Sequence, residues 1–167
     1  MPTLVLLATL IGLSVPSDPL GPARAGLLQC HSPDTARKTC AALAGYTFEV
    51  DGRILNQAEV MLTPSPLIVM RNVSPVVVRD GAVCGELAGL DNAVFTSGGR
   101  PVAPAMASMI RAQVSAAFAQ IGKEACTTYT PQGDGLLAQV AVDGVARPEL
   151  NQPVIWVSPS DGYVVAP

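Results

Sequence analysis

Charged and aromatic side chains are both scarce in this sequence. Charged residues make up 14% of its 167 residues and aromatic residues 4%, and the longest run of like charge is Arg37-Lys38. A nucleic-acid-binding surface needs a basic face that neutralises phosphates, and a single-strand binder also needs aromatic platforms for the bases. The net charge is −3 and no basic block is present, so the composition argues against nucleic acid as a partner.

The sequence also lacks the short motifs that carry common enzyme chemistry. It contains no Gly-x-Ser-x-Gly, no Walker loop, no His-Glu-x-x-His and no Gly-x-Gly-x-x-Gly. His31 is the single histidine, so a Ser–His or Cys–His nucleophile would have to use it. We therefore predict no catalytic, cofactor-binding or metal-binding site, and we favour a protein that is not an enzyme.

Long apolar runs are missing as well, and the one notable run is Leu4–Val15 at the start of the chain. Its twelve residues fall short of the roughly 20 that a membrane-spanning helix needs. Several prolines follow it, and then Ala23-Arg24-Ala25, which matches the small-x-small pattern of a cleavage site. We predict a cleaved export signal over residues 1–25, with a retained membrane anchor as the alternative. Residues 26–167 would then form a single globular domain, without a membrane span, in the periplasm or outside the cell.

Four cysteines are present, and export decides how they are interpreted. An even number of cysteines in an exported chain favours disulfides. Metal sites need closely spaced ligand pairs, whereas the gaps between these cysteines are 9, 43 and 41 residues. Sequence alone leaves three pairings open, of which we favour Cys30–Cys40 with Cys84–Cys126.

Two helices are predicted. Ser32, Pro33 and Asp34 resemble a helix start and Gly45 a helix stop, which indicates a short helix over about 33–44. A longer helix is predicted over about 104–121, where apolar residues recur at steps of three and four and Gly122 follows. The members of this apolar stripe are Met106, Met109, Ile110, Val114, Ala117, Phe118 and Ile121.

The remaining segments carry strand signals, namely alternating or β-branched apolar residues between Asp-Gly and proline turns. The predicted strands are 46–50, 54–62, 67–70, 76–78, 82–87, 94–96, 127–130, 136–142, 154–157 and 163–165. The order of elements predicts an α+β fold: a mainly antiparallel sheet of short hairpins, stapled by disulfides and packed by the two helices.

The C-terminal section supplies the candidate binding patch. Arg147 stands in a polar, proline-rich segment, Trp156 lies in an apolar strand, and Tyr163 follows the next turn. Aromatic and arginine side chains together commonly anchor interfaces. The competing interpretation is that Trp156 belongs to the core, because it alternates with Ile155 and Val157.

Two function classes remain. We favour a small exported, disulfide-containing protein without enzymatic activity, which binds a protein or another envelope component. The alternative is a small extracytoplasmic hydrolase that uses His31 or paired carboxylates. Glu49, Asp51 and Glu59 are candidates for that pair, since one strand and its neighbour across a hairpin carry them. A concave pocket with convergent polar groups would distinguish a small-molecule site from a flat interface.

Overall fold

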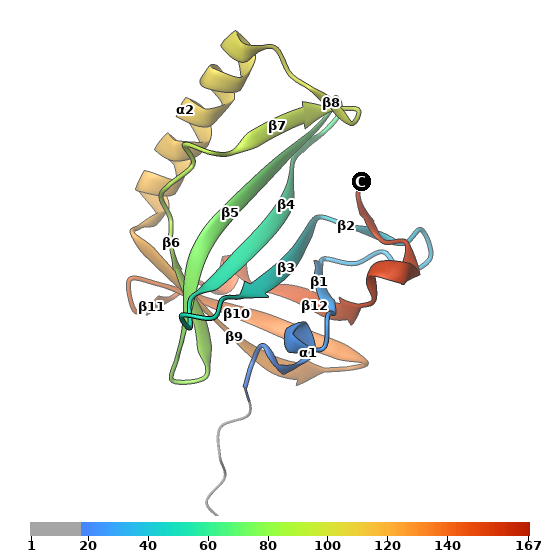
Figure 1. Cartoon of the computed structure of the whole chain (residues 1–167), viewed down its shortest axis with the longest axis vertical. Helices are drawn as coiled ribbons and strands as arrows, with labels where there is room; N and C mark the ends of the chain where they lie inside the picture. The colour runs from blue at the N-terminus through green and yellow to red at the C-terminus, as the bar shows by residue number, and fades with distance from the viewer. Residues whose placement is uncertain (1–17) are drawn as a thin grey trace, which may run out of the picture.

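The computed structural model describes residues 18–167, which form a closed antiparallel β-barrel with one long helix beside it (Figure 1). The apolar run Leu4–Val15 lies outside the described residues. The barrel strands are β1 (Leu28–His31), β3 (Ala42–Phe48), β4 (Ile54–Pro64), β5 (Leu67–Arg79), β6 (Ala82–Glu86), β9 (Glu124–Gln132), β10 (Gly135–Val142) and β12 (Gln152–Val157).

Barrel closure follows from the pairing of these strands. Their order around the barrel is β4-β3-β1-β12-β10-β9-β6-β5, and β5 pairs with β4 to complete the circle. The pairing of β1 with β12 joins Leu28 to Val157, from opposite ends of the described chain. Because every barrel strand has two neighbours, its backbone hydrogen-bonding groups are not left at an open edge.

The remaining helices and short strands are not part of the eight-stranded barrel wall. The helices are α1 (Gly21–Arg24), α2 (Pro104–Ile121), η1 (Pro148–Leu150) and η2 (Pro159–Asp161). The short strands are β2 (Thr39–Cys40), β7 (Val94–Ser97), β8 (Arg100–Pro101), β11 (Val145–Ala146) and β13 (Val164–Val165). In Figure 1, α1 lies at the lower end of the barrel near β1, while α2 stands beside the upper part of β5 and β7.

The predicted α+β fold, a mainly antiparallel sheet of short hairpins packed by two helices, is wrong, because the strands form a closed barrel. Most predicted strands do coincide with observed ones, and the segments 67–70 and 76–78 belong to the single long strand β5. The error concerns how the strands assemble: pairing between β1 and β12 and between β4 and β5 closes the sheet upon itself. A closed barrel packs its core from its own inner side chains, so it needs no helical layer.

The predicted helix over 33–44 is also wrong. Its start signals serve a turn instead: the Asp34 carboxylate accepts a hydrogen bond of 3.0 Å from the Arg37 backbone N–H, and Asp34 pairs with Thr39 across the turn. The chain then returns through β2 and β3, alongside β1. Asp favours both helix starts and tight turns, because its side chain caps a free N–H in either setting.

The long helix α2 has the predicted bounds, but it buries less than the apolar stripe implies. Ile110, Val114 and Phe118 pack on a cluster around Met70 and Phe95, at the projecting ends of β5 and β7. None of the helix residues is fully buried, and Met106 and Met109 are 45% and 61% exposed. The helix therefore covers one end of the barrel wall rather than the core of the domain.

Candidate site in the barrel lumen

The lumen is formed by side chains that alternate inward along the strands. The registers place Gln29, Ala44 and Ala58 beside one another on the inner face, and His31 beside Ala42. Because side chains alternate between the two faces of a strand, the residues next to these in the sequence point outward. Many inward positions hold small residues, namely Ala42, Ala44, Ala58, Ser74, Gly85 and Ala125. Small side chains leave space inside an eight-stranded barrel, which larger side chains would fill.

One end of the lumen is closed by the residues that precede β1. Leu20 is fully buried and contacts an apolar cluster that includes Val83, Phe48 and Trp156. Arg24 helps to fix this segment, because its guanidinium lies 2.7 Å from the Asp18 carboxylate and 4.0 Å from the centre of the Phe48 ring. Residues 18–25 thus act as a stopper for the barrel, which we call the plug.

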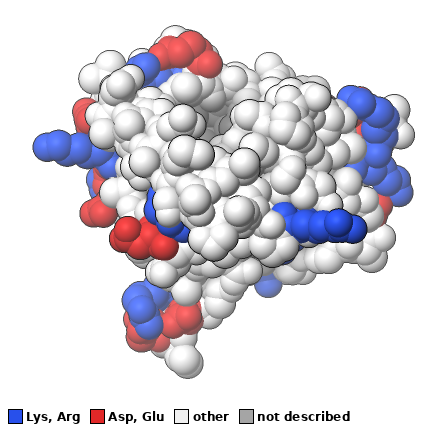
Figure 2. Space-filling view, turned by 90° about the horizontal axis from the view of Figure 1, so that it is seen from above, with Lys and Arg blue, Asp and Glu red and all other residues white. Residues whose placement is uncertain are grey.

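Above the plug, the lumen contains a cavity of about 410 Å³. Its upper lining includes the last residue of β1, His31, the first residue of β12, Gln152, and Met61 near the end of β4. These strand ends all lie at the side of the barrel away from α1, so the cavity opens at the end that Figure 2 shows from above. Charged side chains lie mainly at the margins of that face, and uncharged atoms occupy its middle.

A polar cluster lies deep in the lumen. The hydroxyl groups of Tyr46 and Tyr129 both donate to Gln29 Oε1, at 2.8 Å and 3.4 Å. Burial raises the pKa of both tyrosines, so the hydroxyls stay protonated. Gln29 is fully buried, and its Nε2 has no hydrogen-bond partner within residues 18–167. Asn56 lines the cavity next to Tyr46.

His31 lies nearer the open end and is held neutral. Burial lowers the pKa of its imidazole from the ordinary value of 6.5 to about 4. Its Nδ1 is buried and makes no hydrogen bond to any described residue. Buried polar atoms in folded proteins are nearly always paired, so two unpaired nitrogens, on Gln29 and His31, mark the lumen as a place where a polar group is expected to bind.

A second hollow of about 370 Å³ lies on the outer face of β3, β4 and β5. It borders Asn72, whose Oδ1 is a further buried atom without a partner in the described part of the chain. The charged groups of this outer groove satisfy each other, since Arg71 and Glu59 form an ion pair of 2.9 Å. Compared with the outer groove, the lumen has two unpaired polar atoms instead of one, and Gln29 there is fully buried. We therefore regard the lumen as the candidate site.

The disulfides follow the favoured pairing. Cys30 is bonded to Cys40, and Cys84 to Cys126. The first bond ties β1 to β2, and the second links the adjacent strands β6 and β9. Disulfides of this kind are typical of proteins that work in an oxidising compartment. Among residues 18–167, no helix has both the length and the apolar character needed to cross a membrane.

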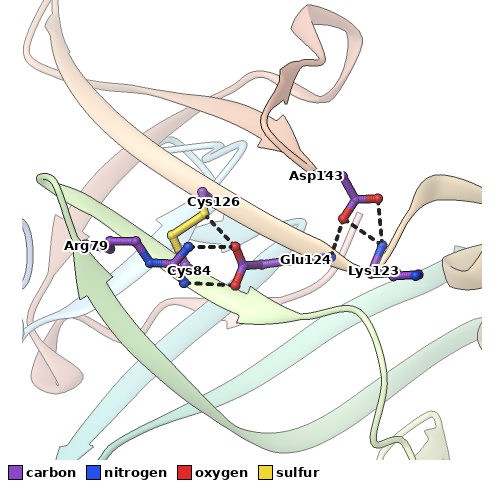
Figure 3. A network of polar contacts seen from close by, with 6 residues as sticks. All are labelled: Arg79, Cys84, Lys123, Glu124, Cys126 and Asp143. Carbon is purple, nitrogen blue, oxygen red and sulfur yellow. Dashed lines mark hydrogen bonds and ion pairs between the residues drawn. A yellow bond between two sulfur atoms is a disulfide. The ribbon is translucent and has the colours of Figure 1, made fainter.

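An ion pair adjoins the second disulfide on the outer wall of the barrel (Figure 3). Arg79 donates two hydrogen bonds to the Glu124 carboxylate, at 3.0 Å and 2.9 Å, and this interaction lowers the pKa of Glu124. Cys84, Cys126 and Glu124 are close enough to surround a metal ion, with ligand atoms within 4.8 Å. Both sulfur atoms are engaged in the disulfide, however, and a thiolate is what binds metal.

The three residues of the predicted binding patch do not come together. Trp156 faces inward and packs in the plug cluster, as the core interpretation expects. Tyr163 packs against the Cys30–Cys40 disulfide and Val157 outside the barrel. Arg147 pairs with Glu149 and donates to the carbonyl of Ile121, at the end of α2.

The candidate carboxylates also lie apart from the lumen. Glu49 and Asp51 both pair with Arg53, at 3.0 Å and 2.7 Å. Hydrogen bonds from the Arg53 backbone and guanidinium lower the pKa of Asp51, which is the opposite of what a general acid requires. Glu59 pairs with Arg71 on the outer groove.

Sequence reasoning therefore missed most of the lumen residues. Gln29, Asn56 and Gln152 belong to no recognisable motif in the sequence. One signal was present: in Leu28-Gln29-Cys30-His31 the polar residues alternate with apolar ones, as on a strand with one polar face. That the polar face points inward emerges only from the closed barrel. Comparisons with protein-family models, curated proteins and solved structures found no match to this chain.

Proposed function

We propose that this protein is an exported binding protein that holds a small, mostly apolar molecule in the lumen of its barrel. The observation that carries the proposal is the open lumen cavity, with the unpaired Nδ1 of His31 in its wall and the unpaired Nε2 of Gln29 next to the wall residues Tyr46 and Tyr129. A ligand group that pairs with either atom would remove the cost of leaving a buried polar group unsatisfied, about 1–3 kcal/mol.

The size and lining of the cavity support this function. Small-molecule pockets usually have volumes of about 300–1,000 Å³ and are mainly apolar with a few placed polar groups. The lumen matches both conditions, at about 410 Å³ with alanine and valine as its commonest lining residues. Eight-stranded barrels are wide enough to enclose one small ligand.

The two disulfides support an extracytoplasmic location, in the periplasm or outside the cell. A barrel with its strands joined and one end closed by the plug keeps its shape without a ligand, so binding does not need to order the wall. Preorganisation of this kind reduces the entropic cost of binding.

The test is binding of the uncharged fluorescent probe N-phenylnaphthylamine to the oxidised protein. We expect saturable 1:1 binding with a blue-shifted emission. Ala44→Phe puts a ring into the cavity and should weaken binding by at least about tenfold, since a filled pocket loses the probe's apolar contacts. Thr47→Phe is the matched control, because Thr47 lies on the same strand and is exposed.

Circular dichroism and thermal melting establish that each variant is folded. Should Ala44→Phe fail to fold, Ala58→Leu places a smaller side chain at the neighbouring inward position. Equal probe binding by the wild type and both lumen variants would overturn the proposal, and so would the absence of any binding to the wild type.

A further inference from the structure

We infer that the natural ligand is an uncharged amphiphile, an apolar chain or ring with a hydroxyl or amide head, and that it enters the lumen head first. This inference rests on the proposed function and adds the chemical class and the orientation of the ligand. It follows from three features of the lumen: its charge, the positions of its polar groups and the character of its rim.

The lumen wall carries almost no charge. No Lys or Arg is among the described residues that line the cavity, and Glu86 is the one acidic residue there. Glu86 pairs in register with Glu124, on the strand face that points outward, near the rim. His31 is neutral at physiological pH. A ligand carboxylate or ammonium group placed deep in the lumen would lose its hydration without gaining a counter-ion, which costs several kcal/mol.

The largest group of neighbouring polar side chains in the lumen lies at its inner end. Tyr46 lies beside Asn56, which lies beside Ser74, and all three face the cavity. The Tyr46 and Tyr129 hydroxyls donate to Gln29 Oε1, so each hydroxyl oxygen keeps lone pairs that can accept a hydrogen bond. Gln29 does not itself line the cavity, but its Nε2, in the same cluster, is a buried donor without a partner among residues 18–167. Acceptors and a donor that lie together suit a head group that both donates and accepts, such as a hydroxyl or a primary amide.

On β4 and just after β6 the rim of the lumen is apolar and leads toward α2, whereas its polar residues His31 and Gln152 lie on β1 and β12. Val60, Met61 and Leu87 line the upper part of the cavity. Val60 also packs against the cluster that contains Phe95 and the inner side of α2. An apolar tail that leaves the cavity would therefore meet further apolar surface instead of water, and burial of each CH₂ group contributes about 0.8 kcal/mol. A head-out orientation would leave the deep polar cluster without a ligand partner and would forgo the contact between the apolar tail and the surface near α2.

The test compares three ligands with the same twelve-carbon chain and different heads: 1-dodecanol, dodecanoate and dodecylammonium. Each competes with N-phenylnaphthylamine for the oxidised wild-type protein at pH 7.5. We expect the alcohol to displace the probe at a concentration at least about tenfold lower than either charged ligand. If dodecanoate or dodecylammonium competes as well as the alcohol, or if the alcohol does not compete, the inference is wrong.

A second measurement locates the head group. Tyr46→Phe removes one hydroxyl and keeps the ring, so the alcohol should bind about three- to tenfold more weakly, as expected for one lost hydrogen bond. Tyr163→Phe is the matched control, since Tyr163 packs outside the barrel. Unchanged affinity in Tyr46→Phe would contradict the head-first orientation. These outcomes differ from failure of the proposed function, which would appear as probe binding that is absent or indifferent to Ala44→Phe.

Discussion

His31 is the residue whose surroundings make the stability of the barrel depend on pH. In the unfolded chain its pKa is near 6.5, and burial lowers it to about 4 in the fold. Between these values the unfolded state binds more protons, so stability falls as the pH falls from 6.5 toward 4. The change in pKa from 6.5 to about 4 sets an upper limit of about 3 kcal/mol on this loss, and the partial exposure of the imidazole reduces it further.

The prediction is checked by urea unfolding at several pH values between 4 and 6.5. His31→Leu should abolish most of the slope above pH 5, because the chain has no second histidine and its carboxylates titrate mainly below that pH. Glu86 also borders the cavity, and Glu86→Gln serves as the control that should keep the slope. An equal slope in the wild type and His31→Leu would show that the imidazole is not held neutral by burial.

The two phenylalanines of the apolar cluster beside α2 should differ in their contributions to stability. Phe95 is 2% exposed, whereas Phe118 on α2 is half-buried. We expect Phe95→Ala to lower the free energy of unfolding by about 3–5 kcal/mol and Phe118→Ala by about 1–3 kcal/mol, since the second site loses less contact and leaves a smaller cavity. Chemical denaturation measures both values. Met109→Ala, at an exposed position on the same helix, should stay within about 0.5 kcal/mol, and equal losses for the two phenylalanines would contradict the observed packing.

At the level of elements, the plug should contribute strongly to the stability of the barrel. Leu20→Ala should lower the free energy of unfolding by about 2–5 kcal/mol, because Leu20 is fully buried at the closed end of the barrel. Val50→Ala, at a fully exposed position, should change it by less than about 0.5 kcal/mol. Urea unfolding with intrinsic fluorescence follows both variants, and Trp156 in the same cluster provides the signal.

The cleavage site after Ala25 remains a prediction, and the plug gives a reason to expect processing further upstream. Cleavage after Ala25 would remove Leu20 and Ala23, which are both buried. We therefore expect the intact mass of the exported protein to include Leu20. A mature chain that starts at Gly26 and is as stable as one that starts at Asp18 would show that the plug is dispensable.

The helix α2 illustrates the limit of a strong local pattern. Its period and its Gly122 stop identify its bounds from the sequence, since both are properties of consecutive residues. The same stripe does not reveal how much of the helix is covered. Ile110, Val114 and Phe118 contact the cluster on β5 and β7, whereas Met106 and Met109 of the same stripe are exposed.

At the level of the whole molecule, the two disulfides should contribute unequally. The Cys84–Cys126 bond joins residues 42 apart and the Cys30–Cys40 bond residues 10 apart. A longer closed loop restricts the unfolded chain more. Replacing Cys84 and Cys126 by alanine should therefore lower the free energy of unfolding by about 4 kcal/mol, and replacing Cys30 and Cys40 should lower it by about 3 kcal/mol. Equilibrium unfolding without reductant measures the two double variants. A larger loss for Cys30/Cys40 would mean that native-state packing outweighs loop length.

The sequence by itself determined the local features of this protein: the bounds of α2, the positions of most strands and the turns that separate them. Each depends on residues close together in the chain, such as the alternation of Tyr46 and Phe48 or the turn at Asp51-Gly52. The cysteine spacing argued for disulfides for a similar reason, because it left no close ligand pair for a metal.

Only the tertiary structure decided that the strands close into a barrel and that the barrel encloses a site. Closure depends on β1 meeting β12, and no local pattern encodes a pairing between Leu28 and Val157. The alanines, serine and glycine that line the cavity give a weak periodic signal, although their small size is what leaves the space. Gln29 and His31 flank Cys30 in the sequence without forming a motif, and the closed wall turns their side chains inward, away from water, which makes them candidate ligand contacts.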